Sequence, residues 1–309
     1  MNILLIAEES IGIRLVKELM GLPYHVVAVM ATPPAKAAAA NSVWSEAKSL
    51  GYQTWPAELV KGAGFADSLR KAGVDVLLNV HSRYIIREEV LAAAKIGAFN
   101  LHPGPLPQYA GLNAPSWAIY NGEHKHGVTL HKMDPGIDTG AIVLERMFDI
   151  SDRDTGLSVA LRCMQLGIPL ILELLQMASA NRDSLPYRPQ PSGHRRYYGK
   201  QVPQEGRIIW DRPARQVFNF IRACDYAPFP SPWGSPQAQY NGQAISINRA
   251  ALSGRGSREA PGTIQQGERG EFCVACSDEW LEIKGILSSG RKTSPMECLA
   301  AGGKFDEIS

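Results

Sequence analysis

The sequence predicts an α/β protein: a doubly wound, mostly parallel sheet, followed by a smaller C-terminal domain built on a β-barrel. Short apolar runs, typical of strands buried on both faces, alternate with amphipathic helical segments from residue 2 to residue 101. After residue 235 the apolar and polar residues alternate in short runs separated by turns at Asn241-Gly242 and Pro261-Gly262. The second pattern is typical of a small antiparallel barrel.

The same patterns locate the individual strands and helices of residues 1–180. Buried strands are predicted at residues 2–7, 24–30, 74–80 and 97–101, and further strands at 127–132 and 141–149. Helices are predicted from apolar spacing and capping residues at 8–21, 42–50, 65–73, 88–95 and 156–180. Glu8 and Glu9 occupy the turn after the first strand. Two carboxylates would repel a pyrophosphate there, so a dinucleotide site is not expected.

Two polar side chains sit at the end of the strand at 97–101. Asn100 and His102 point to the same face of that strand, because side chains alternate along it. Three prolines and a glycine in 103–107 then end any regular element. Ligand crevices of open α/β sheets lie where such loops leave the sheet. Asn100 and His102 are therefore candidate site residues.

A second loop has the same character. The strand at 127–132 runs into a loop with proline and glycine that presents Asp134 and Asp138. An amide, an imidazole and a carboxylate together can stabilise an oxyanion while moving one proton. A capped turn with a hydrogen-bonded histidine is the alternative for the first loop alone, but two such loops favour a site. His131, inside the strand, is expected to be half-exposed rather than catalytic.

Composition limits the classes of function. With 309 residues, of which 45% are hydrophobic, the chain can bury the cores of two domains. A net charge of +2 gives no strong attraction to nucleic acid or to an anionic membrane. The five cysteines are scattered, and the Cys273-x-x-Cys276 pair lacks the second pair that a zinc site needs. No metal site is predicted.

The sequence also predicts where the protein resides. The apolar start at 2–7 is too short for a signal peptide, and we expect no apolar run that approaches the length needed to span a membrane. A soluble, cytoplasmic protein without a membrane partner is therefore predicted.

The motifs together resemble those of the folate-dependent formyltransferases: Asn100-x-His102, a Pro-rich loop ending in Gly111, Gly127-Val-Thr, and Asp138-Thr-Gly140. That family includes methionyl-tRNA formyltransferase, the amino-sugar formyltransferases and the hydrolase part of formyltetrahydrofolate dehydrogenase. The resemblance covers most of residues 1–285. The family often has His-x-Ser-Leu-Leu-Pro where this chain has His102-Pro-Gly-Pro-Leu-Pro, so no role of that serine carries over.

The resemblance implies N10-formyltetrahydrofolate as the formyl donor and assigns roles to matching positions. The catalytic triad of the family falls on Asn100, His102 and Asp138. Residues expected to bind the folate are Arg83, Tyr84, Ile85, Gly136, Ile137 and Gly140. Residues expected to bind the acceptor substrate are Pro103, Gly104, Tyr109, Asn113 and Arg222.

The implied reaction is attack of a primary amine on the formyl carbon. Asn100 and a protonated His102 would hold the oxyanion that forms. Asp138 would either raise the basicity of His102 or relay the proton to the departing folate nitrogen, and both roles stay open at this point.

The acceptor is inferred from a linker. Transfer-RNA formyltransferases carry a basic loop near residues 31–41, but this chain has only Lys36 there, which supplies little affinity for nucleic acid. A small-molecule amine is therefore expected: an amino sugar, with or without a nucleotide, or an amino-acid-type metabolite. Methionyl-tRNA is the alternative acceptor. A formyltetrahydrofolate hydrolase and a non-catalytic binding module are further alternatives.

The resemblance also implies the domain organisation. Residues 1–185 are expected to form the Rossmann-like catalytic domain. Residues 186–206, rich in proline, are expected to form a linker that packs along it. Residues 207–309 are expected to form the C-terminal domain, an OB-like barrel followed by a tail.

Overall fold

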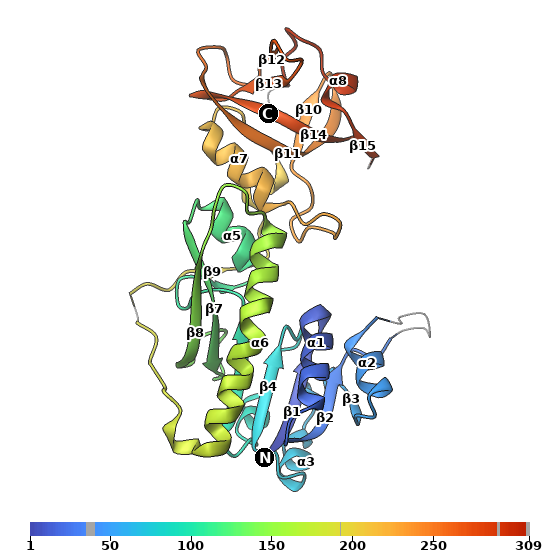
Figure 1. The fold of residues 1–309 in the computed structure, drawn as a ribbon, viewed down its shortest axis with the longest axis vertical. Coiled ribbons are helices and arrows are strands. Elements are labelled where there is room, and N and C mark those ends of the chain that lie inside the picture. The colour runs from blue at the N-terminus through green and yellow to red at the C-terminus, as the bar shows by residue number, and fades with distance from the viewer. Residues whose placement is uncertain (35–40, 192, 289–290, 307–309) are drawn as a thin grey trace. The chain divides into compact units, whose positions relative to one another are not determined.

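A computed structural model describes residues 1–34, 41–191, 193–288 and 291–306 of the chain (Figure 1). Lys36 lies outside the described residues. The chain divides into two compact units that interleave in sequence. The first comprises Met1–Gly111, Gly127–Met147 and Arg162–Tyr197, and the second comprises Leu112–His126, Phe148–Leu161 and Tyr198–Ser309. The expected domain limits at 185 and 206 stay predictions.

The first unit is built on a seven-stranded sheet. Its strands are, in chain order, β1 (Asn2–Ala7), β2 (His25–Ala31), β3 (Thr54–Pro56), β4 (Val76–Val80), β5 (Gly97–His102), β7 (Lys125–Lys132) and β8 (Ile142–Asp149). The strand order is β3-β2-β1-β4-β5-β7-β8, in which β1 to β5 pair in parallel and β7 runs antiparallel to β5. A doubly wound, mostly parallel sheet was predicted, and the structure confirms it.

Helices connect these strands. They are α1 (Glu9–Met20), α2 (Val43–Ser49), the 3₁₀ turn η1 (Ala57–Lys61), α3 (Phe65–Lys71), α4 (Glu88–Leu91), α5 (Ala114–Tyr120) and α6 (Gly156–Ala180). β1 carries a continuous apolar run because it is covered on both faces, and Ile3, Leu4 and Leu5 have no exposed surface. α1 approaches this strand closely: a Cβ on Gly12 would lie 2.9 Å from the Ala7 Cβ.

α4 is shorter than predicted. It ends at Leu91 instead of Lys95. The backbone N–H groups of Lys95 and Ile96 donate to the carbonyls of Val74 and Asp75, in the segment just before β4. The chain here therefore hydrogen-bonds to that segment rather than continuing the helix.

α6 corrects the expectation that no apolar run approaches membrane-spanning length. By length and composition alone, this 25-residue helix is able to cross a membrane. The core helix of a soluble protein passes the same test. Leu170, Ile171 and Leu174 have no exposed surface, and a Cβ on Gly167 would lie 2.6 Å from the Leu101 side chain. This stretch of α6 is packed as part of the protein core.

The second unit contains an antiparallel sheet, as predicted for the C-terminal part of the chain. Its strands are β10 (Gln237–Tyr240), β11 (Gln243–Gly256), β12 (Ile264–Gln266), β13 (Phe272–Ala275), β14 (Glu279–Ser288) and β15 (Arg291–Thr293). The order is β10-β11-β14-β13-β12, with β15 also paired to β14. The pairing of β11 with β14 shifts register at three places, and such bulges bend a strand as a small barrel requires.

The remaining elements are short, apart from the helix that packs on this sheet. They are β6 (Ala110–Gly111), which pairs with β9 (Tyr197–Tyr198), the 3₁₀ turns η2 (Arg182–Ser184) and η3 (Pro203–Gly206), and the helices α7 (Ala214–Ala223) and α8 (Pro295–Cys298). α7 lies against β11 and β14 of the antiparallel sheet.

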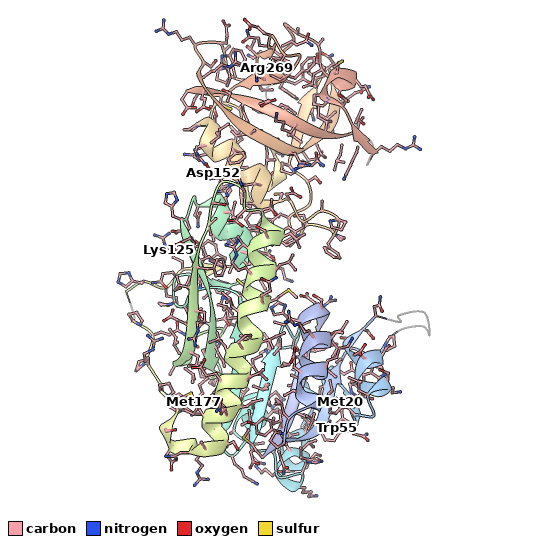
Figure 2. The ribbon with its side chains drawn as sticks, in the orientation of Figure 1. Met20, Trp55, Lys125, Asp152, Met177 and Arg269 are labelled. Atoms are coloured by element: carbon pink, nitrogen blue, oxygen red, sulfur yellow. The ribbon has the colours of Figure 1, made fainter. Side chains whose placement is uncertain are left out.

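Burial of β1 predicts a stability difference between two conservative truncations. Leu5→Ala should lower the free energy of unfolding by about 2–5 kcal/mol, because it empties a fully buried site. Met20→Ala, at the end of α1 where the side chain is 58% exposed (Figure 2), should change it by less than about 0.5 kcal/mol. Urea denaturation measures both. Equal midpoints for the two variants would contradict the burial of β1.

Candidate functional site

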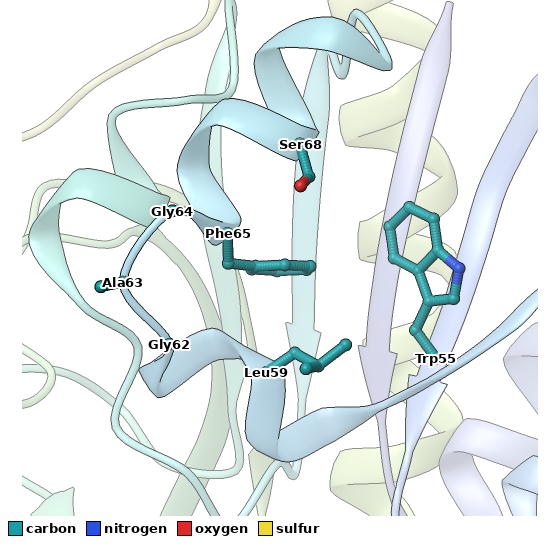
Figure 3. A pocket seen from close by; sticks show the side chains of 7 residues that line it. All are labelled: Trp55, Leu59, Gly62, Ala63, Gly64, Phe65 and Ser68. Atoms are coloured by element: carbon teal, nitrogen blue, oxygen red, sulfur yellow. The ribbon is translucent and has the colours of Figure 1, made fainter.

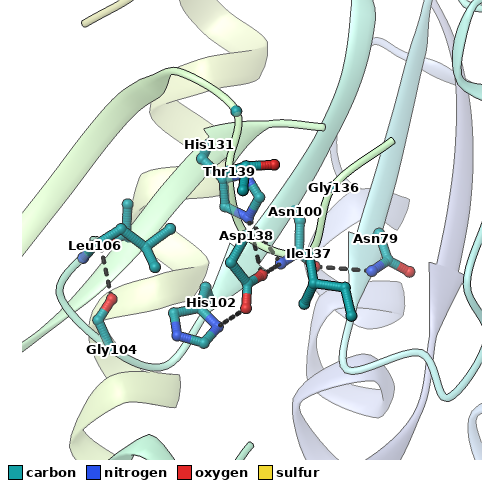
Figure 4. Close-up of polar contacts among 12 residues, drawn as sticks. Asn79, Asn100, His102, Gly104, Leu106, His131, Gly136, Ile137, Asp138 and Thr139 are labelled. Atoms are coloured by element: carbon teal, nitrogen blue, oxygen red, sulfur yellow. Dashed lines mark hydrogen bonds and ion pairs between the residues drawn. The ribbon is translucent and has the colours of Figure 1, made fainter. Parts of the chain in front are cut away.

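The candidate site forms at the C-terminal end of β5, where the sequence places it. Asn100 and His102 project from the same face of this strand (Figure 4). Phe99 and Leu101 alternate with them and are buried. The strand thus uses its apolar residues for the core and presents its polar residues to the site.

Sheet register places three polar side chains in one row. Asn79 of β4 is the register partner of Asn100, and Asn100 is the register partner of His131 of β7. Partners in register lie on the same face of a sheet. The Asn79 Nδ2 atom lies 2.8 Å from Asn100 Oδ1, and Asn100 Nδ2 lies 3.1 Å from His131 Nε2. The row is therefore hydrogen-bonded across three adjacent strands.

Asp138 brings a carboxylate to this row from the loop after β7. Its side chain is only 10% exposed, and its backbone has φ 52°, in the left-handed region. Oδ1 lies 3.4 Å from both Asn100 Nδ2 and His131 Nε2. Oδ2 accepts a hydrogen bond of 2.8 Å from the Gly111 N–H and lies 3.5 Å from His102 Nδ1. The loop thus places both oxygens against nitrogen atoms.

These surroundings keep Asp138 ionised. Burial alone would raise the pKa of the carboxyl, but His102, His131 and the Gly111 N–H outweigh it and hold the pKa well below its usual range. A carboxylate that is buried and satisfied in this way is a fixed negative charge at the site.

His102 is held from both sides of its ring. Its Nε2 lies 2.6 Å from the Tyr109 carbonyl, which only accepts, so Nε2 carries a hydrogen. Nδ1 faces Asp138. Burial lowers the pKa of His102, although Asp138 and the Tyr109 carbonyl oppose that shift. The resting ring is therefore neutral, with its lone pair on Nδ1.

The proline-rich loop after His102 is fixed by one threonine of β7. The Thr129 hydroxyl donates to the Gly104 carbonyl at 2.8 Å and accepts from the Leu106 N–H at 3.3 Å. Thr129 is also the register partner of His102 and is fully buried. The loop that carries Pro103 and Gly104 is therefore tied to the strand beside the site.

The segment predicted to be a linker along the first domain holds the Asp138 loop. Gln190 Nε2 donates to the carbonyls of Asp138 and Gly140, at 2.9 and 2.7 Å. The Arg195 guanidinium donates to the carbonyls of Ile137 and Asp138, at 2.8 and 3.3 Å. Both side chains bind backbone atoms, so they fix the path of this loop irrespective of its side chains.

The residues expected to bind the folate lie on two loops. Arg83 and Ile85 are exposed and Tyr84 is partly buried, with the Lys61 ammonium 4.7 Å from its ring centre. The first loop begins at His81, whose Nδ1 lies 2.9 Å from Glu9 Oε2. That hydrogen bond lowers the pKa of the Glu9 carboxyl.

On the second loop, Gly136 and Ile137 are exposed, but Gly140 is buried. A Cβ on Gly140 would lie 1.8 Å from the Lys132 carbonyl oxygen. Gly140 therefore lets the loop pack closely against β7. This close packing accounts for a glycine at position 140 without a role in ligand binding.

The five residues expected to bind the acceptor are divided between the units. Pro103, Gly104 and Tyr109 belong to the first unit, and Asn113 and Arg222 to the second.

Arg222 is buried within the second unit. Its guanidinium donates to the carbonyls of Ser151 and Asp154, at 2.8 and 3.1 Å, and to Asn219 Oδ1 at 3.0 Å. Burial lowers the pKa of Arg222. These bonds occupy three donors of its guanidinium, and a role at the edge of the substrate cleft stays a prediction.

Sequence reasoning missed two members of the cluster. His131 was expected to be half-exposed, but it is 2% exposed and contacts Asn100 and Asp138. Asn79 was treated as part of a buried strand. The signal for both was available in principle, because a polar residue in the middle of an apolar strand run needs a partner.

A separate pocket lies away from these residues. It is a cavity of about 450 Å³ whose lining includes Trp55, Leu59 and Phe65, with the Trp55 and Phe65 rings edge-to-face at 6.0 Å (Figure 3). Its lining contains none of the predicted site residues. Within the part of the chain that the structure describes, no group of three or more His, Cys, Asp or Glu side chains is arranged to hold a metal ion.

Family models match both parts of the chain. The model described as formyl transferase matches residues 20–175, and the model of the formyl transferase C-terminal domain matches residues 200–304.

Solved structures with a similar fold include sugar-modifying enzymes. An N-formyltransferase from Helicobacter canadensis, in complex with folinic acid and dTDP-3-aminofucose, is 19% identical with a TM-score of 0.69, covering 91% of this chain and 97% of that one. The sugar 3N-formyl transferase WlaRD, in the presence of dTDP and 5-N-formyl-THF, is 18% identical with a TM-score of 0.68, covering 92% and 96%. HypX from Aquifex aeolicus, in complex with tetrahydrofolic acid, is 20% identical with a TM-score of 0.63, covering 96% and 46%. At these identities the likeness is one of fold.

The closure of the Asp138 loop predicts the effect of one added methyl group. Gly140→Ala should destabilise the protein by about 1–3 kcal/mol, because the new Cβ clashes with the Lys132 carbonyl, which is backbone. Gly21→Ala is the matched control, since no atom lies within 4 Å of that Cβ position and φ is −86°. Thermal unfolding of both variants measures the difference. A wild-type curve for Gly140→Ala would show that the loop does not close as described.

Proposed function

Because the chain belongs to the formyl transferase family, we propose that it transfers a formyl group from N10-formyltetrahydrofolate to the primary amine of an amino sugar. The family and the enzyme class are those that the motifs predicted. The observation that carries the proposed chemistry is the cluster of Asn100 and His102, from the end of β5, with Asp138, from the loop after β7.

An amino sugar is the acceptor class that the likenesses support. The Helicobacter canadensis enzyme is named with an aminofucose and WlaRD is named a sugar 3N-formyl transferase, and this chain is similar in fold to both along more than nine-tenths of its length. The single lysine at 31–41 supports a small-molecule acceptor over a transfer RNA. Whether the sugar carries a nucleotide is left to the experiment below, and a cytoplasmic location stays a prediction.

The donor supplies an activated formyl carbon to the reaction. Two side chains offer apolar surface for its flat ring system: Ile85, on the loop after β4, is 73% exposed, and Ile137, on the loop after β7, is 45% exposed. Large apolar side chains exposed beside a polar cluster are suited to binding a ring.

Asn100 is the donor that we assign to the formyl oxygen. Its Nδ2 carries two hydrogens. His131 Nε2 and Asp138 Oδ1 lie 3.4 Å apart on the same side of it, so one N–H can serve both. The other N–H is then available for the charge that develops when the amine attacks, and such a donor stabilises the transition state strongly.

His102 is the base that we assign to the amine proton. Its neutral resting form has a lone pair on Nδ1, and Nε2–H stays on the Tyr109 carbonyl. Proton uptake at Nδ1 creates an imidazolium between that carbonyl and the ionised Asp138, both of which stabilise it. The protonated ring then returns the proton to the departing folate nitrogen, so Asp138 acts by raising the basicity of His102.

The proposal is tested by offering the wild-type protein N10-formyltetrahydrofolate with three acceptor pools. These are nucleotide-linked amino sugars, including dTDP-3-aminofucose; free amino sugars and amino acids; and methionyl-tRNA. Mass spectrometry identifies formylated products, and formate is measured in parallel. A formylated amino sugar is expected. Product only from amino acids or only from methionyl-tRNA, formate without an acceptor, or folate binding without turnover would each overturn the proposal.

The assigned roles predict severe losses in three alanine variants. Asn100→Ala, His102→Ala and Asp138→Ala should each lower kcat by ~10²-fold or more, as removal of one transition-state donor does elsewhere. The fold should persist, as judged by circular dichroism. His25→Ala is the control, because His25 begins β2 at the opposite end of the parallel strands and is exposed. Wild-type turnover in any of the three would exclude that residue from the chemistry.

A further inference from the structure

We propose that His131 is a positioning residue whose ring tautomer sets the orientation of the Asn100 side-chain amide. The inference rests on the proposed function only in the role of Asn100, and its structural part stands on contacts within β4, β5, β7 and the backbone of Lys132. His131 is 2% exposed, so its hydrogen-bond partners are those that the protein supplies.

A backbone carbonyl fixes one nitrogen of the His131 ring. The Nδ1 atom of His131 lies 2.9 Å from the carbonyl oxygen of Lys132. A carbonyl only accepts, so Nδ1 carries a hydrogen, and it is the single ring hydrogen of the neutral form that we propose for His131. The lone pair is then on Nε2, the atom that faces Asn100.

The tautomer determines which way the Asn100 amide points. A lone pair on His131 Nε2, 3.1 Å away, needs a donor, and the amide offers one only through Nδ2. The amide oxygen is thereby turned to the other side, toward β4, where Asn79 Nδ2 lies 2.8 Å from it. Asn79 Oδ1 is buried without a hydrogen-bond partner in the described residues, so its amide follows the orientation of Asn100 and His131 sets that orientation.

The other states of the row are unfavourable. If the Asn100 amide turned over, its oxygen would face the lone pair of His131, whereas the Asn79 amide could turn with it. The opposite tautomer of His131 would correct the first contact but would set a lone pair against the Lys132 carbonyl. In a buried row each such contact carries the cost of an unmade hydrogen bond. The Lys132 carbonyl of β7 therefore fixes the orientation of the Asn100 side-chain amide, through the ring of His131.

This orientation matters for the reaction assigned above. With Nδ2 on the side of Asp138, the Asn100 amide presents its N–H groups beside that carboxylate (Figure 4). With the amide turned over, an oxygen would stand there instead, and it would repel a developing oxyanion. His131 touches neither reactant in this account; it acts through Asn100.

Two substitutions of His131 by uncharged amide side chains distinguish a role in positioning Asn100 from a role in packing alone. In His131→Gln the amide of the longer side chain reaches the place of Nε2 and offers an acceptor there. In His131→Asn the shorter side chain reaches only the place of Nδ1. We expect kcat to stay within a few-fold of wild type in the first, and to fall toward the ~10²-fold loss of a missing donor in the second. KM for the folate should change little in either.

Nitrogen-15 NMR of the histidine rings tests the tautomer without relying on activity. The His131 signals are assigned by their loss from the spectrum of His131→Gln. We expect Nδ1 protonated and Nε2 unprotonated in the wild-type protein at neutral pH. A protonated Nε2 would overturn the proposal.

The two measurements also separate this inference from the proposed function. If the wild-type protein formylates none of the amino sugars, the proposed function fails, and the NMR result still decides the tautomer. If the protein is active, equal kcat values for His131→Gln and His131→Asn would overturn the proposal even with the expected tautomer, because the acceptor at the Nε2 position would then have no effect on Asn100.

Discussion

The buried carboxylate of Asp138 is the constraint on which the rest of the site depends. A charge removed from water is costly unless donors or opposite charges surround it. Here the Gly111 N–H and the Asn100 amide donate to the carboxylate, and a ring nitrogen of each of two histidines lies within 3.5 Å of it. Those groups come from β6, from β5 and from β7. Their convergence explains why Gln190 and Arg195 bind the backbone of the Asp138 loop: a small displacement would leave the charge unpaired.

Fixed backbone acceptors define the protonation states around this charge. The Tyr109 carbonyl requires a hydrogen on Nε2 of His102, and the Lys132 carbonyl requires one on Nδ1 of His131. The two histidines lie beside the same carboxylate, and these two carbonyls favour opposite tautomers for them. This gives them different capacities: His102 keeps a lone pair facing Asp138 and is suited to accept a proton, whereas His131 keeps its lone pair for Asn100.

The sequence was sufficient for the parts of the fold that depend on local pattern. Continuous apolar runs predicted the parallel strands. Clusters of proline and glycine located the loop that follows Asn100 and His102 and the loop that carries Asp138. The residues that the sequence analysis missed depend on the register between strands that are far apart in the chain. Asn79 and His131 are 52 residues apart in the chain, and only the pairing of β4, β5 and β7 puts them on either side of Asn100. The predicted exposure of His131 was wrong for the same reason. The helix α4 ends early because Lys95 and Ile96, which were expected to continue or follow it, hydrogen-bond to the segment before β4.

The ionisation of Asp138 is the most direct test of this account. Carbon-13 NMR of aspartate-labelled protein, with Asp138→Asn used to assign the carboxyl signal, follows its charge through an acid titration. A pKa held below its usual range adds stability that is complete above about pH 4 and is lost as the pH falls further. We therefore expect the Asp138 carboxyl to stay ionised as the pH falls through the range in which free aspartate protonates. Protonation at or near neutral pH would contradict the account, because the histidines and the Gly111 N–H would then not be holding a charge.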